Sequence, residues 1–96
     1  MNIFECLLKA GDLDRVQKLA RNSVNVCQAT EEGWTPMLIA CQEDRLNIVQ
    51  FLFHNGAKDD VRRPNNDGTT PMYVACEKDN FPIVQYLHNH GAAPDI

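Results

Sequence analysis

Two nearly identical stretches of seven residues lie 35 positions apart in this chain of 96 residues, TPMLIAC at 35–41 and TPMYVAC at 70–76. When the chain is shifted by 35 positions, residues 33–61 fall on residues 68–96, and 14 of the 29 aligned pairs are identical. A shift of 33 positions reveals a weaker third copy near the amino terminus. Such a period indicates an array of one small unit, which buries its apolar side only against its neighbours.

The repeated stretch begins with a signal for the start of a helix. The Thr35 hydroxyl can accept a free backbone N–H as an N-cap, and Pro36 has no N–H to leave unpaired at the first helical position. The helix is expected to run to about Glu43, because Asp44, like Asp79 in the last copy, suits a turn residue with positive φ. Each of the two stronger copies is therefore predicted to open with a short helix.

A second helix is predicted after the turn and is ended by a glycine, Gly56 in the middle copy. Its apolar stripe comprises Leu46, Val49, Leu52 and Phe53. Helices of about eight or nine residues are unstable alone in water, because nucleation costs more than so few hydrogen bonds return. They must pack against neighbouring copies in an all-α fold. The predicted core comprises Phe4, Leu7, Leu8, Met37, Ala40, Leu46, Val49, Leu52, Met72, Ala75, Val84 and Leu87.

The order Gly-x-Thr-Pro, alanine, turn, Ile-Val-x-x-Leu and Gly-Ala resembles the ankyrin repeat, and the resemblance covers the whole chain. The family signature Thr-Pro-Leu-His-x-Ala is matched by residues 35–40 and 70–75, except that Leu38 and Tyr73 replace the histidine. That histidine commonly braces neighbouring turns by hydrogen bonds, so this bracing is expected to be absent. The amino-terminal copy lacks Thr-Pro and is interpreted as an atypical capping repeat.

The resemblance implies a single domain over residues 1–96, an α-solenoid of about three helix-turn-helix repeats with projecting hairpin-like loops. Loops of this kind are called fingers below. The expected repeats are approximately residues 1–29, 30–64 and 65–96.

The second finger is expected to be longer than the first. Gly56 to Gly68 is twelve positions, whereas the matching span Ser23 to Gly33 is ten, so two residues are added. Such additions are tolerated in a finger or at its base. Because residues 91–96 resemble the start of that long finger, two interpretations stay open, a piece of a longer array and a very short protein.

Composition and charge narrow the classes of partner. A net charge of −4 and a pI near 5.2 disfavour binding to a phosphate backbone. The longest apolar run, residues 37–41, is far shorter than the roughly 18 residues of a membrane span, and Glu5 stands where a signal peptide would be apolar. We expect a cytoplasmic or nuclear monomer that contacts neither nucleic acid nor membrane.

No pattern in the sequence suggests catalysis. It contains no Gly-rich phosphate loop, no Gly-x-Ser-x-Gly elbow, no His-Glu-x-x-His motif and no Cys-x-x-Cys pair. His88 and His90 are two positions apart and so do not share a helix face. We expect them at the surface or at a helix end, and we expect no enzyme activity, metal site or cofactor.

The four cysteines are expected to be reduced thiols. Cys41 and Cys76 occupy matching small-residue positions in the predicted first helices, where both are expected to be buried. Helices in contact lie about 8–10 Å apart, too far for the Cα spacing of about 4.4–6.8 Å that a disulfide requires. Cys27 falls in a predicted finger and is expected to be the more exposed thiol.

The resemblance also implies a function. Ankyrin-like arrays bind protein partners through the finger tips and the exposed side of the first helices, which together form a concave groove. Carried over to this sequence, the partner-binding residues are Glu31, Glu32, Trp34, Gln42, Glu43, Asn66, Asp67, Thr69, Glu77 and Lys78, with Lys9 and Ala10 in the matching positions of the first copy. This surface is mostly acidic, so we expect a protein partner with a basic patch.

Two questions stay open at the level of sequence. Trp34 has the residue type that often dominates interface energy, yet its indole could equally lie along a neighbouring finger and hold it. The alternative function is structural, in which the repeats act as a spacer or cap within a longer array and contact no partner themselves.

Overall fold

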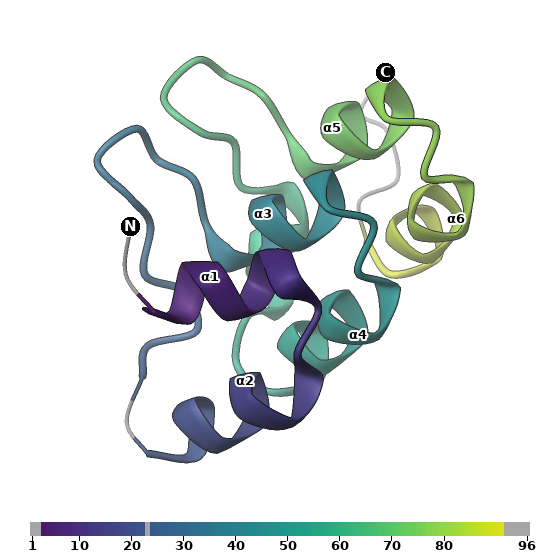
Figure 1. Ribbon diagram of the computed structural model, residues 1–96. Helices are drawn as coiled ribbons and strands as arrows, with labels where there is room; N and C mark the ends of the chain where they lie inside the picture. Colours follow the sequence, from purple (N-terminus) through teal and green to yellow (C-terminus); the bar gives the residue numbers. More distant parts are fainter. Residues whose placement is uncertain (1–2, 23, 92–96) are drawn as a thin grey trace.

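The computed structural model describes residues 3–22 and 24–91 (Figure 1). This part of the chain contains six α-helices and one 3₁₀ helix, and no strand. The elements are α1 (Ile3–Ala10), α2 (Leu13–Arg21), α3 (Pro36–Gln42), α4 (Leu46–His54), η1 (Lys58–Arg62), α5 (Pro71–Glu77) and α6 (Phe81–Asn89). The predicted all-α repeat solenoid is confirmed.

The helices form two layers. Helices α1, α3 and α5 make the inner layer, in which each contacts the next, and α2, α4 and α6 make the outer layer in the same way. Each inner helix also packs against the outer helix that follows it. Two loops, residues 24–34 and 63–69, project from the same side of the stack (Figure 1). They are the first and the second finger.

The predicted starts of α3 and α5 are confirmed. The hydroxyls of Thr35 and Thr70 each accept the backbone N–H of the residue three positions on, at 3.1 and 3.2 Å. The turns after these helices contain Asp44 and Asp79, with φ of 59° and 58°. Only a few residue types tolerate this left-handed conformation, and aspartate is one of them. Local backbone chemistry therefore determines where α3 and α5 begin and end.

Most of the predicted core is buried. The residues with exposed fractions of 9% or less are Phe4, Leu7, Leu8, Met37, Ala40, Val49, Leu52, Ala75 and Leu87. The other three, Leu46, Met72 and Val84, are only partly buried. In α4 the buried stripe is centred on Ile48, Val49 and Leu52, so Leu46, two positions before Ile48, lies to one side of it. Ile83 takes the place of Ile48 in α6 and is fully buried as well.

One polar contact recurs between successive repeats and is called the carbonyl contact below. The Arg45 guanidinium donates to the Lys9 carbonyl, from Nη2 at 2.7 Å and from Nε at 3.2 Å. Asn80 occupies the matching position one repeat later, and its Nδ2 donates to the Cys41 carbonyl at 2.8 Å. Each of these residues precedes an outer helix and reaches the end of the inner helix of the preceding repeat, α1 for Arg45 and α3 for Asn80. The position of the missing signature histidine holds Leu38, which is fully buried among apolar residues.

The two added residues lie at the base of the second finger. There the chain forms η1, which contacts α4 and α5. Asp60 and Val61 of this short helix are buried, so the longer segment packs against the stack, and the finger beyond it keeps its short turn.

The histidines near residue 90 are surface or helix-end residues, as predicted. His88 is exposed, and His90 caps the end of α6. The His90 ring stacks on Tyr86 with ring centroids 3.9 Å apart, and its Nδ1 lies 2.7 Å from the Tyr86 carbonyl oxygen. Phe53 meets both rings edge to face. These aromatic contacts join α4 to α6 in the outer layer.

Two expectations about cysteines are wrong. Cys41 is fully buried as predicted, and burial raises its pKa to about 12. Cys76 is exposed, because α3 lies between α1 and α5 whereas α5 has an inner helix on only one side within the described residues. Cys27 is partly buried and its thiol donates to the Gly56 carbonyl at 3.2 Å, so Cys6 and Cys76 are the exposed thiols.

The carbonyl contact makes a testable contribution to stability. Asn80→Ala is expected to lower the free energy of unfolding by about 1–3 kcal/mol, because it removes a buried donor from a buried carbonyl. Urea unfolding followed by far-UV circular dichroism measures this. The control is Asn55→Ala, since the Asn55 amide donates to the Phe51 carbonyl in an exposed position. Equal losses in the two variants would show that the contact between repeats adds nothing.

Thiol alkylation should follow the observed burial. At about pH 8, iodoacetamide is expected to modify Cys6 and Cys76 first, because only accessible thiolates react. Cys27 should react more slowly, since burial and the negative charge of Asp60 raise its pKa. Cys41 should react only as fast as the protein unfolds. Mass spectrometry of timed samples gives the order, and early labelling of Cys41 would contradict the packing of α3.

Candidate functional site

The two fingers are joined to each other by hydrogen bonds. The Asn66 backbone N–H donates to the Glu32 carbonyl at 3.0 Å, and its side-chain Nδ2 donates to the Glu31 carbonyl at 2.8 Å. Nearer the stack, Arg63 Nη1 donates to the Cys27 carbonyl at 3.0 Å. The fingers thus form one continuous edge, and they hold their tips in a fixed register.

Each finger also carries an internal brace. In the first finger the Thr30 hydroxyl accepts the Trp34 backbone N–H at 3.1 Å. In the second finger the buried Asn65 takes this role, since its Oδ1 accepts the N–H groups of Asp67 and Thr69 at 2.8 and 3.0 Å. Threonine and asparagine suit this position because both can hydrogen-bond the backbone of their own turn.

The residues predicted to contact a partner are distributed over two zones. The finger tips present Glu31, Glu32, Asn66 and Asp67, and all four are exposed. The ends of the inner helices present Gln42, Glu43, Glu77 and Lys78, of which the last two are exposed and the first two are partly buried. The remaining two, Trp34 and Thr69, are partly buried. None of the ten is fully buried.

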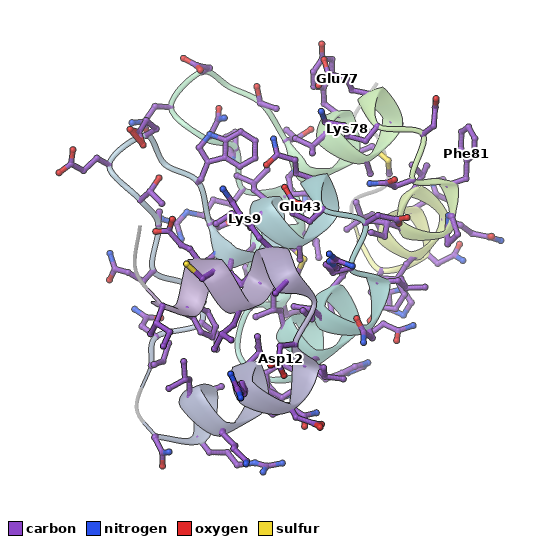
Figure 2. All side chains as sticks on the ribbon, viewed as in Figure 1. Lys9, Asp12, Glu43, Glu77, Lys78 and Phe81 are labelled. Carbon is purple, nitrogen blue, oxygen red and sulfur yellow. The ribbon has the colours of Figure 1, made fainter. Side chains whose placement is uncertain are left out.

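The ends of successive inner helices form a row. Figure 2 shows Lys9, Glu43 and Lys78 following one another across the molecule, from α1 through α3 to α5. Glu43 and Lys78 are the C-cap residues of α3 and α5, and Lys9 lies in the last turn of α1. Their order follows from the packing of α3 between α1 and α5.

An open hollow of about 920 Å³ lies between α1 and the first finger. A second, smaller hollow of about 320 Å³ adjoins the ends of the inner helices. Trp34, Thr30, Glu5, Glu32 and Ile39 line both. The apolar residues that line the larger hollow include Ile3, Phe4, Leu8, Val24, Trp34, Pro36 and Ile39.

Most residues that line the larger hollow were not predicted from the sequence to contact a partner. The predicted surface positions came from the ankyrin resemblance, which implies contacts at the finger tips and on the exposed side of the first helices, whereas the hollow is lined mainly by other residues of α1 and the first finger. The available signal was Ile3, a large aliphatic residue at a position where the middle copy has Pro36. The Ile3 side chain is 68% exposed, which a residue of the packed core would not be.

The described residues offer little for catalysis. Within them, no group of three or more His, Cys, Asp or Glu side chains is placed to hold a metal ion. Asp60 and Cys27 interact, yet the Asp60 charge raises the thiol pKa instead of activating it. No described helix is long and apolar enough to cross a membrane.

Comparison with known proteins locates the chain among repeat proteins. A family model described as ankyrin repeats in three copies matches residues 3–96. Human 2-5A-dependent ribonuclease is 42% identical over 55 residues, which cover 56% of this chain and 7% of that protein. Human protein phosphatase 1 regulatory subunit 27 is 36% identical over 52 residues, covering 54% of this chain and 34% of that protein.

A third relative shows the same partial match. The ankyrin repeat, SAM and basic leucine zipper domain-containing protein 1 of Equus caballus is 33% identical over 55 residues, which cover 57% of this chain and 12% of that protein. The matched stretch therefore spans about a third or less of each of these relatives.

The contact between the fingers can be tested at two matched glycines. Gly33 and Gly68 have φ of 85° and 83°, so alanine is strained at both by about 1–2 kcal/mol. A Cβ at Gly33 would lie 2.5 Å from Asn66 Oδ1 and 2.8 Å from its backbone N, whereas nothing lies within 4 Å at Gly68. Gly33→Ala is therefore expected to lower the free energy of unfolding by a further amount of about 1–3 kcal/mol, because the added methyl group would be overpacked against Asn66.

Urea unfolding of both variants measures the difference, and amide exchange at Asn66 should accelerate only in Gly33→Ala. If the two variants lose the same stability, the fingers do not pack against each other as described.

Proposed function

We propose that this chain, a member of the ankyrin-repeat family, binds a protein partner through the finger tips and the exposed ends of the inner helices. The chain belongs to that family because the family model matches residues 3–96, and ankyrin repeats are in general protein-interaction modules. The observation that carries the proposal is the pair of hydrogen bonds from Asn66 to Glu31 and Glu32, which hold both fingers in one register.

Rigidity gives this surface a physical advantage in binding. Fingers and helix ends that are already fixed lose little conformational freedom when a partner docks. The ten predicted contact residues then act from a surface whose shape does not change. Asn66 differs from the other nine residues, because its side-chain amide already donates to the neighbouring finger. It therefore contributes to the shape of the surface.

Charge indicates the class of partner. Glu31, Glu32 and Asp67 lie at the finger tips, and Glu43 and Glu77 lie at the helix ends. These carboxylates outnumber the lysines of the row, Lys9 and Lys78. A partner with a basic patch is therefore favoured, and the attraction should act mainly on the rate of association.

The proposal also covers the mode of action and the cellular location of the protein. The chain acts by binding alone, as a monomer, without catalytic residues, cofactor or metal, and without contact to nucleic acid or membrane. Four free thiols and the acidic net charge support a reducing cytoplasmic or nuclear environment and a protein partner.

The test starts from proteins captured by the immobilised chain and then purified. The double variant Glu43→Gln and Glu77→Gln is expected to bind such a partner at least about tenfold more weakly, mainly through slower association. Asp14→Asn, an exposed change in the outer layer, is the matched control and should bind normally. Association should also slow when salt is raised from about 50 to about 300 mM.

Equal weakening by the outer-layer control, or association that is indifferent to salt, would contradict binding through this surface. A chain that captures no protein, yet adds stability when joined to further repeats, would support the structural alternative.

A further inference from the structure

The larger hollow is an open depression whose lining includes exposed apolar surface. Ile3 of α1 is 68% exposed and stands at this hollow, while Phe4 and Leu8 form part of its buried floor. Val24 and Trp34 contribute from the first finger. Its volume of about 920 Å³ falls in the range of sites that bind small ligands or side chains, roughly 300–1,000 Å³. A bulky apolar group of a partner would displace water from Ile3 and from the finger.

The charged residues of the hollow are mainly carboxylates. Glu31 and Glu32 are exposed on the finger, and Glu5 lines both hollows from α1. The Thr30 hydroxyl donates to Glu32 Oε2 at 3.4 Å and accepts the Trp34 backbone N–H. The finger therefore holds a carboxylate on the same turn as the indole. Among the described residues that line the two hollows, Lys9 is the one cation, and it lines only the smaller hollow.

An indole beside carboxylates is suited to a guanidinium group. The face of tryptophan attracts cations, and arginine can stack on an aromatic ring while its planar edge pairs with a carboxylate. Anionic ligands such as phosphates would meet repulsion from the three glutamates. A ligand that complements the hollow therefore carries an apolar group and, next to it, a cationic group.

We propose that the hollow between α1 and the first finger binds a short segment of the protein partner, with a bulky aliphatic side chain against Ile3 and an arginine between Trp34 and the carboxylates of Glu31 and Glu32. This inference rests on the proposed protein-binding function and specifies the chemistry of one part of the partner. The hollow selects the sequence of the segment, and the row of helix ends supplies additional contact area.

The chain offers a direct probe, because Trp34 is its one tryptophan. The ligand to be titrated is a capped peptide in which two leucines alternate with two arginines between terminal glycines. A saturable change in Trp34 fluorescence is expected. Replacing both arginines by citrulline, which keeps the shape and removes the charge, should weaken binding at least about tenfold, and so should replacing both leucines by alanine.

Protein variants locate the site. Ile3→Ser should weaken binding of the leucine–arginine peptide, and the double variant Glu31→Gln and Glu32→Gln should abolish its preference over the citrulline peptide. Because all three residues are exposed, the fold should persist, which circular dichroism checks. Asp14→Asn, an exposed change on α2 that lies outside both hollows, is the matched control and should leave peptide affinity unchanged.

Three results would overturn the inference: no saturable fluorescence change, equal affinity for the citrulline peptide, or variants of the hollow that bind the peptide like Asp14→Asn. The proposed function is tested separately by the captured partner. If that partner binds normally to the hollow variants and weakly to the variant at Glu43 and Glu77, the interaction surface stands and the hollow is not its peptide site. If neither set of variants affects the partner, both proposals fail.

Discussion

The burial of α3 between α1 and α5 is the constraint on which the rest of the structure depends. Six of its seven residues, 36–41, are buried. A helix of this length has no stability of its own, because so few hydrogen bonds cannot offset the cost of nucleation. It exists because it is packed on both sides. Since the first finger leads directly into α3 and the second is hydrogen-bonded to the first, the geometry of the proposed binding surface follows from the same packing.

The parts of the fold that depend on local chemistry could be predicted from the sequence, and the parts that depend on neighbours could not. The N-caps Thr35 and Thr70 act within their own helices, so their effect is visible in a single copy. Cys41 and Cys76 have nearly identical sequence surroundings, yet one is fully buried and the other is exposed. The difference lies in which helices flank them, and that information is not present in either seven-residue stretch.

The candidate site could likewise be predicted from the sequence only in part. The ten surface positions were implied by the resemblance to the ankyrin repeat, and each retains some exposure in the structure. The role of Asn66 was not visible, because its amide acts on carbonyls 34 and 35 positions earlier in the chain. The hollow beside Ile3 was missed for a similar reason, since it is formed by α1 and a finger that are distant in sequence. Composition identified the acidic character of the surface, but only the fold brings three glutamates and one indole to the same place.

One position in the repeat shows how stability is divided between a repeat and its neighbours. In the first copy this position is Asp12, which caps its own helix by accepting the Arg15 N–H at 3.2 Å. In the later copies it is Arg45 and Asn80, and neither side chain caps the helix it precedes. Both donate instead to the inner helix of the preceding repeat, which a carboxylate cannot do.

Helices α4 and α6 thus lack a local side-chain cap and gain a bond between repeats. A stack built this way takes more of its stability from contacts between units than from each unit alone, so its repeats should unfold together. Cooperative unfolding is what keeps the fingers in register, because a repeat that could open alone would also release its finger. The carbonyl contact and the shape of the binding surface therefore both depend on the packing of successive repeats against each other.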